Sequence, residues 1–222
     1  MSFYQTLQEQ TFSAREKMLS SPVIAHCSQG AVTREMYIAF LTQAYYHVSQ
    51  TVPLLMCAGS RLPASHEWVR GALAEYIEEE YGHQEWILND ITHCGGDAER
   101  VRHGQPRQPI ELMIASLYHR IERVNPMSIF GMVHVLEGTS VVIATPIAEA
   151  LEKSLGLTEH ATSYLRSHGA LDLEHLKFFA SLMDRVTNPA DQEAIIHTAR
   201  RVYSLYGEML NQLSEPEYEP AE

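Results

Sequence analysis

The sequence has few cysteines, few basic residues and no long apolar segment, and each shortage excludes a class of protein. The three cysteines, Cys27, Cys57 and Cys94, are scattered and include no C-x-x-C pair. This pattern provides neither a disulfide framework nor a zinc–thiolate site, and it is typical of a reducing cytoplasm, where we expect the protein to act. No apolar run approaches the ~18–20 residues of a membrane span, and the first residues, MSFYQTLQEQ, lack the pattern of a signal peptide.

The scarcity of basic residues gives the chain a strongly acidic balance. Lys and Arg total 16 against 28 Asp and Glu, so the net charge is −12. This charge argues against nucleic acid or an anionic membrane surface as a partner. With 222 residues, 45% of them apolar and 20% charged, the composition is that of a folded globular protein of one large or two small domains. We therefore expect neither nucleic acid nor a membrane surface as a partner.

Apolar residues recur at three- and four-residue spacing along most of the chain, which predicts helices. No segment favours a strand, because the β-branched run at 141–143 lies inside a longer helical pattern. The expected helices cover about 33–62 (with a kink or break at Pro53), 65–94, 110–124, 127–155, 158–186 and 189–213. The sequence thus predicts an all-α fold, a single-domain up-down bundle of about seven helices over 1–213, and an acidic flexible tail at 214–222.

Histidine is unusually frequent, and the sharpest motif is His168-Gly-Ala-Leu-Asp172-Leu-Glu-His175. Each residue of a helix advances by about 100°, so a continuous helix would place His168, Asp172 and His175 on one face. Two imidazoles and a carboxylate on one face can bind a divalent transition metal. In a chain with 12 histidines the same spacing also arises by chance, so the motif alone leaves both explanations open.

Glu80 and His83 form a second candidate pair, in the helix expected at 65–94. Glu-x-x-His is the spacing with which carboxylate-bridged diiron bundles direct two ligands at one centre. The alternative is a solvated face, because Glu80 ends a run of three glutamates. Tyr76 and Trp86 flank His83 at helical spacing, which favours a partly buried stripe and therefore the ligand interpretation.

Glu137 is a third candidate because it stands alone in an otherwise apolar helix. A carboxylate in such surroundings must be paired, protonated or bound to a cation. His134 lies one turn away and could be its partner in a purely structural hydrogen bond. The other interpretation is that Glu137 bridges two metal ions.

The carboxylates and imidazoles on three long helices could together form one site. The six candidate metal ligands are Glu80, His83, Glu137, His168, Asp172 and His175. This set suits two metal ions that share a bridging carboxylate and leave positions open for dioxygen, and its lack of a thiolate disfavours a structural zinc site. Tyr45 and His47 could line the same cavity, although a satisfied core histidine is the simpler account of His47.

The motif Glu80-Tyr81-Gly82-His83-Gln84-Glu85-Trp86, the lone Glu137 and the later His-x3-Asp-x2-His motif resemble the haem-oxygenase-like diiron oxidases. These form the iron-containing redox enzyme branch of the TenA/PqqC-like superfamily. The resemblance covers roughly residues 10–210. It implies a haem-oxygenase-like bundle that binds two irons, or iron with manganese, and uses O₂ as a co-substrate to oxidise a small amino- or fatty-acid-like molecule. We also expect a homodimer.

Related branches of the superfamily supply the alternatives. The thiaminase II branch needs a nucleophilic cysteine on the helix at 130–139, where this chain has none. The PqqC branch needs a basic pocket, which is not evident among so few Lys and Arg residues. We therefore expect an O₂-dependent non-haem iron oxidoreductase with no catalytic residue beyond the metal ligands. A TenA-like hydrolase of a pyrimidine or similar heterocycle, or a non-catalytic metal- or ligand-binding bundle, would be the alternatives.

Overall fold

The computed structural model describes residues 2–170 and 172–214, except for the side chains of residues 168–174 and 214. Every regular element in these ranges is a helix, which confirms the expected all-α fold. The α-helices are α1 (Phe3–Leu19), α2 (Pro22–Ser28), α3 (Arg34–Val48), α4 (Thr51–Arg61), α5 (Glu67–Glu80), α6 (His83–His93), α7 (Ala98–Arg102), α8 (Gln108–Arg123), α9 (Ile129–Leu155), α10 (Ser163–Ala170), α11 (Asp172–Asp184) and α12 (Pro189–Asn211). The predicted tail at 214–222 lies outside the described residues beyond residue 214.

The described helices outnumber the seven or so expected because local backbone chemistry divides the longer predicted segments. The first predicted helix is broken ahead of Pro53, which falls in the first turn of α4, where its missing N–H costs no hydrogen bond. The second is divided at Gly82, whose φ of +94° lies in the left-handed region that favours glycine. This turn ends α5 after Glu80 and begins α6 at His83, so it sets the relative placement of the two side chains.

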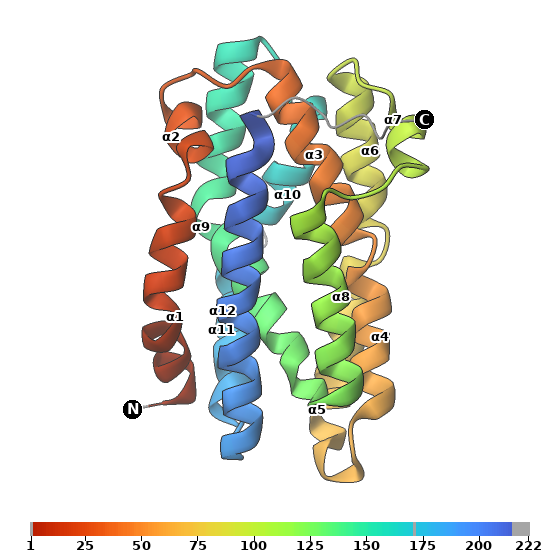
Figure 1. Cartoon of the computed structure of the whole chain (residues 1–222), viewed down its shortest axis with the longest axis vertical. Helices are drawn as coiled ribbons and strands as arrows, with labels where there is room; N and C mark the ends of the chain where they lie inside the picture. The colour runs from red at the N-terminus through yellow and green to blue at the C-terminus, as the bar shows by residue number, and fades with distance from the viewer. Residues whose placement is uncertain (1, 171, 215–222) are drawn as a thin grey trace.

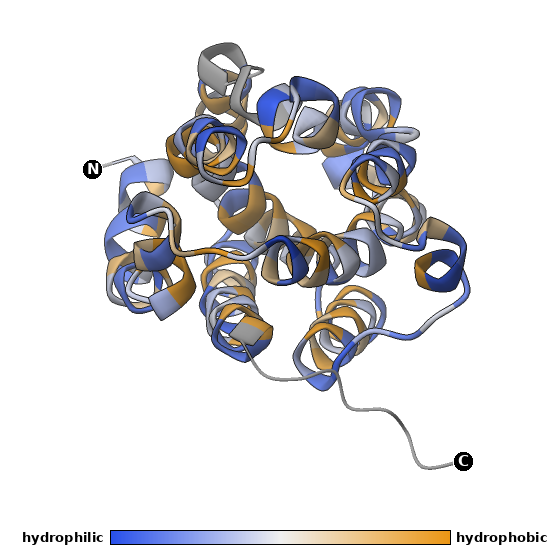
Figure 2. Cartoon of the chain, turned by 90° about the horizontal axis from the view of Figure 1, so that it is seen from above, coloured by the Kyte–Doolittle hydropathy of each residue, from blue (hydrophilic) through white to orange (hydrophobic). Residues whose placement is uncertain are grey.

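The long helices run along the vertical axis of the molecule, and α9 lies behind α12 in Figure 1. α9 packs against α2, α4, α8, α10, α11 and α12, so together with α12 it joins most helices of the bundle. Viewed from above, the helices turn their hydrophobic faces inward (Figure 2). The apolar periodicity of the sequence is therefore satisfied by burial against neighbouring helices, as expected for a helical bundle.

One segment, Pro126–Leu155, is long and apolar enough to cross a membrane by length and composition. From the sequence we expect no apolar segment long enough to span a membrane, and this finding corrects that expectation. Of its most apolar window, 61% is buried inside the protein. Its hydrophobicity is explained by its position as α9, which is surrounded by other helices on several sides.

The contact between α9 and α12 is close at Gly131. A Cβ atom at this position would lie 2.6 Å from the carbonyl oxygen of Ile195 and 2.7 Å from the backbone nitrogen of Ala199. Neither atom can move without shifting α12. Gly138, on the same helix, has no neighbouring atom within 4 Å of the equivalent position.

We therefore predict opposite effects for two identical substitutions on α9. Gly131→Ala should destabilise the protein by about 1–3 kcal/mol, because the added methyl group overpacks the α9–α12 contact. Gly138→Ala should stabilise it by about 1 kcal/mol, because alanine has the higher helix propensity and meets no neighbour. Urea unfolding followed by circular dichroism measures both. Equal effects of the two substitutions would contradict the close packing of α12 on Gly131.

Candidate active site

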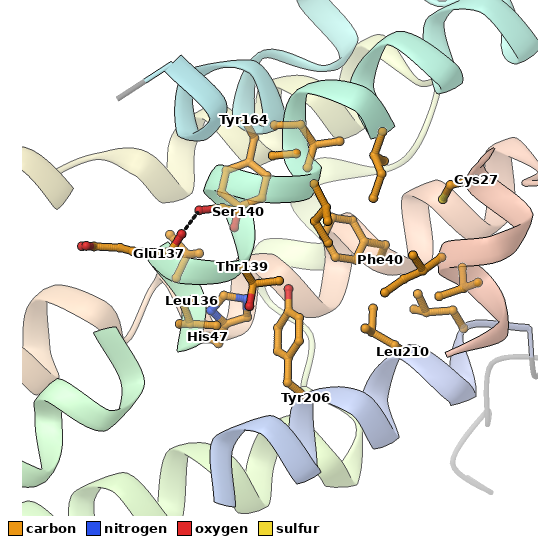
Figure 3. A pocket seen from close by; sticks show the side chains of 18 of the residues that line it. Cys27, Phe40, His47, Leu136, Glu137, Thr139, Ser140, Tyr164, Tyr206 and Leu210 are labelled. Atoms are coloured by element: carbon orange, nitrogen blue, oxygen red, sulfur yellow. Dashed lines mark hydrogen bonds between the residues drawn. The ribbon is translucent and has the colours of Figure 1, made fainter. Parts of the chain in front are cut away.

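The bundle encloses an apolar cavity that extends along one side of α9. The cavity has a volume of about 140 Å³, which is enough for a small organic molecule. Most of its wall is aliphatic or aromatic and comes from α2, α3, α4, α5, α9, α10 and α12. Figure 3 shows Glu137 toward one end of the cavity and Cys27 toward the other, with Phe40 between them.

The polar side chains of the cavity carry no positive charge among the described lining residues. Glu80 and Glu137 are the carboxylates, and neither Lys nor Arg contributes to the described wall. His47 lies in the wall and is nearly buried, with its ring 5.6 Å from that of Tyr206 in an edge-on arrangement. Tyr76 and Tyr164 add hydroxyl groups. The cavity is therefore apolar along most of its length and acidic where α5 meets α9.

Glu137 carries a carboxylate oxygen into this cavity that the described residues leave unsatisfied. Its Oε2 is shielded from solvent and has no hydrogen-bond partner in the described part of the chain. Burial, with the charges of Glu80 and Glu79 as smaller contributions, holds the pKa of Glu137 well above its ordinary value. The hydroxyl of Ser140 donates to the main-chain carbonyl oxygen of Glu137 at 3.0 Å, so this hydrogen bond does not involve the carboxylate (Figure 3). A cation or a proton would relieve this cost.

Glu80 and His83 come together at the turn between α5 and α6. The Nδ1 atom of His83 lies 3.2 Å from Oε2 of Glu80, and the imidazole is nearly buried. Trp86 stacks on the ring of His83 with the centroids 4.1 Å apart, which restricts its orientation. The partly buried stripe expected from the spacing of Tyr76 and Trp86 around His83 is present, although Trp86 itself is 37% exposed.

His175, the last of the motif histidines, faces α5 from α11. Its Nε2 lies 3.3 Å from Oε1 of Glu79, so a carboxylate beside Glu80 also has an imidazole partner. The side chains of His168 and Asp172 lie outside the described residues, as does residue 171 between α10 and α11. Whether His168, Asp172 and His175 share a face therefore stays a prediction. Within the described ranges, no three His, Cys, Asp or Glu side chains are close enough to hold a metal ion by themselves.

Two of the three residues suggested as neighbours of the metal lie elsewhere. His134 is buried, and its Nε2 is 3.2 Å from the hydroxyl of Thr11 on α1, so the expectation that it pairs with Glu137 differs from the observed contact. Tyr45 is buried against Tyr46, with ring centroids 5.6 Å apart, and is not among the residues that line the cavity. His47 does line it. His134 and Glu137 lie only about 60° apart around α9, so the difference comes from the packing of α1, whose Thr11 holds the imidazole of His134 away from the cavity.

Sequence reasoning assigned no role to Tyr76, although its spacing offered a signal. Tyr76 is on α5, four residues before Glu80, and both side chains line the cavity, as i and i+4 residues of one helix face should. Burial is the main cause that raises the pKa of Tyr76, followed by the charges of Glu137, Glu79 and Glu80. The hydroxyl thus keeps its proton and remains a donor.

Residues 38–207 match the family model of the iron-containing redox enzymes. The chain belongs to this family. The match spans α3 to α12 and therefore includes Tyr76, Glu80, His83, Glu137 and the whole His168–His175 motif. No curated protein sequence is significantly similar to the chain.

Solved structures show the same fold at low sequence identity. A domain of unknown function with a haem oxygenase-like fold from Shewanella denitrificans is 21% identical, with a TM-score of 0.83 over 96% of this chain and 92% of that one. A TenA homologue from Pseudomonas syringae is 11% identical (TM-score 0.78, 94% and 91% covered), and a haem oxygenase from Leptospira interrogans is 16% identical (TM-score 0.77, 96% and 100% covered). The haem-oxygenase-like fold expected from the motifs is therefore confirmed.

Membership of the iron-containing redox enzyme family supports the coarse prediction of an enzyme that uses iron. The structural neighbours, at these identities, add the fold and nothing about chemistry. The number of metal ions and the identity of the substrate must therefore be inferred from the residues of the cavity.

The buried His134 predicts a specific pH dependence of stability. Burial, with a smaller effect of Arg15, lowers its pKa from 6.5 to about 4. The unfolded state therefore binds a proton below about pH 6.5, while the folded state stays neutral until about pH 4, so stability falls as the pH decreases between these values. Wild type should lose about 2 kcal/mol more than His134→Gln between about pH 7.5 and pH 5. Urea unfolding at both pH values measures the difference, and parallel losses would show that His134 does not titrate in this way.

Proposed function

We propose that the protein is a non-haem iron oxidase that uses O₂ to oxidise a small organic molecule with an apolar body. The observation that carries this proposal is the carboxylate of Glu137 in an apolar cavity: its buried Oε2 has no partner among the described residues, and it faces the charges of Glu80 and Glu79. A buried carboxylate crowded by like charges is costly in the absence of a cation, and it becomes favourable when a metal ion shares it.

The donor groups around Glu137 fit iron. Glu80, His83 and Glu137 do not form a complete site by themselves, so they would share the centre with His168, Asp172 and His175, and together the six residues would hold two irons or iron with manganese. Iron in such a mixed carboxylate and imidazole set supplies O₂ activation. All donors in this set are oxygen or nitrogen atoms, and the three cysteines are free and remain outside it.

The chain's own residues would bind and shield the substrate. The aliphatic and aromatic wall holds its apolar body and keeps bulk water from the end where Glu80 and Glu137 lie. Trp86 fixes the imidazole of His83 by stacking, and Glu79 does the same for His175 by an ion pair or hydrogen bond. These contacts orient the candidate ligands without needing a metal ion to do so.

The charge of the wall makes haem a poorer candidate than a mononuclear or dinuclear iron centre. A structural neighbour from Synechocystis, a haem oxygenase 11% identical to this chain, is described in complex with haem. Haem carries two carboxylates, which require cationic or neutral donors at the pocket. The charged residues in the described wall here are Glu80 and Glu137, which would repel them.

We further propose that the enzyme is cytoplasmic, consistent with three free cysteines, and that it is a homodimer.

The role of His83 predicts a loss of iron from a single substitution. His83→Ala should lower the affinity for ferrous iron by more than about tenfold and abolish iron-dependent O₂ consumption, while the helical content stays unchanged. His93→Ala is a matched control, because His93 ends the same helix α6, and its ring contacts the carbonyl oxygen of Asn89 and the ring of His160 rather than a carboxylate of the cavity. Iron content by mass spectrometry and an oxygen electrode provide the readouts. Equal iron content in the two variants would contradict the proposal.

The buried carboxylate of Glu137, whose Oε2 has no partner within the described ranges, predicts a gain of stability when its charge is removed. Since its pKa is raised on folding, ionisation destabilises the folded state, and the penalty grows as the pH rises above the unfolded value of about 4.3. Without metal at about pH 8, Glu137→Gln should therefore be more stable than wild type by about 1–3 kcal/mol. Each kcal/mol should raise the melting temperature by about 2–4 °C. With ferrous iron under anaerobic conditions, wild type should gain stability and the variant should not.

The exposed Glu78 provides the control for this experiment, because it lies on α5 near the same cluster. Glu78→Gln should melt like wild type with and without iron. If Glu137→Gln also behaves like wild type in both states, Glu137 is not a metal ligand.

A further inference from the structure

Two tyrosines of the cavity differ in one respect that is informative about its ligand. Tyr37 and Tyr76 both line the cavity, and each is 2% exposed. The hydroxyl of Tyr37 donates to the carbonyl oxygen of Ala161 at 3.1 Å, so its hydrogen-bonding capacity is used by the fold. The hydroxyl of Tyr76 is buried as well, but it has no hydrogen-bond partner within the described residues.

An unpartnered buried hydroxyl destabilises a protein, so a fold gains by having a phenylalanine there instead. The ring of Tyr76 is already held by packing against Phe178, with centroids 5.8 Å apart, and this contact does not require the hydroxyl. A buried group that has a stability cost and no partner among the described residues is characteristic of a ligand site. Tyr76 also sits at the acidic end of the cavity, one turn from Glu80 on the same helix.

The rest of the wall restricts the kind of group that Tyr76 can bind. The described lining offers no positively charged side chain with which an anion could pair, and most of it is aliphatic. A neutral oxygen that accepts a hydrogen bond, carried on an apolar body, matches both properties. The hydroxyl of Tyr76 keeps its proton in this environment and can only gain from such an acceptor.

We propose that Tyr76 anchors the substrate by donating a hydrogen bond to an uncharged carbonyl or similar oxygen, while the substrate's apolar body lies along the cavity toward Cys27. This inference takes from the proposed function only that the cavity is the substrate site. It narrows the substrate to an amphiphile whose oxygen lies beside α5, near the carboxylates of Glu80 and Glu137.

The test uses metal-free full-length protein and two probes of similar length. In 2-octanone the carbonyl accepts a hydrogen bond, whereas 1-octene has no acceptor. Their affinities are measured by displacement of the neutral fluorescent probe N-phenyl-1-naphthylamine. Wild type should prefer 2-octanone, and Tyr76→Phe should lower its affinity by about 3–10-fold, the worth of one hydrogen bond, while 1-octene binds as before. Tyr37→Phe is the matched control and should keep the preference for 2-octanone.

Thermal melting of the same three proteins separates an anchor from a structural group. Tyr76→Phe should melt at or above the wild-type temperature, because it removes an unpartnered hydroxyl, whereas Tyr37→Phe should melt lower, because it leaves the carbonyl oxygen of Ala161 without its donor. Equal 2-octanone affinity in wild type and Tyr76→Phe, or a lower melting temperature for Tyr76→Phe, would overturn the inference. Because no iron is present, these outcomes are independent of whether the protein binds iron and consumes O₂.

Discussion

The structure depends on the repulsion between carboxylates that lie inside an apolar bundle. α9 packs against α2, α4, α8, α10, α11 and α12, and it carries Glu137 into a cavity whose wall is otherwise largely hydrophobic. α5 brings Glu80 into the same cavity, and the more exposed Glu79 adds a smaller negative charge nearby, so two carboxylates share a region with little water to screen them. Such an arrangement is unfavourable by itself, and a bundle of this size could easily hide apolar side chains there instead. Its presence is the main reason to expect a cation.

The surrounding helices keep these carboxylates at one end of the cavity. The turn at Gly82 separates α5 from α6 and leaves Glu80 and His83 in contact across it. His175 approaches from α11 and pairs with Glu79. Away from this end, the cavity is lined by aliphatic and aromatic side chains that reach Cys27 on α2. The proposed iron centre would lie at the acidic end, and the apolar body of the substrate would lie along the other.

The sequence predicted the helices well because each buries an apolar stripe, and such a stripe has a period that can be read directly. It also marked Glu137, since a lone carboxylate in an apolar helix has few structural explanations. It could not predict that His134 contacts Thr11, a residue 123 positions away, because that contact depends on how α1 packs on α9. Nor could it distinguish Tyr76 from Tyr37, since the difference is whether the carbonyl oxygen of Ala161 lies within reach of the hydroxyl.

The central claim is that Glu137 shares its carboxylate with iron. The most direct measurement is a crystal structure of protein loaded with ferrous iron without oxygen, with diffraction data collected on both sides of the iron absorption edge. The account predicts an anomalous peak in coordination contact with a carboxylate oxygen of Glu137 and with the side chains of Glu80 and His83. Full iron occupancy at a position away from Glu137, or a side chain of Glu137 that forms a hydrogen bond to protein alone in the iron-loaded crystal, would contradict it.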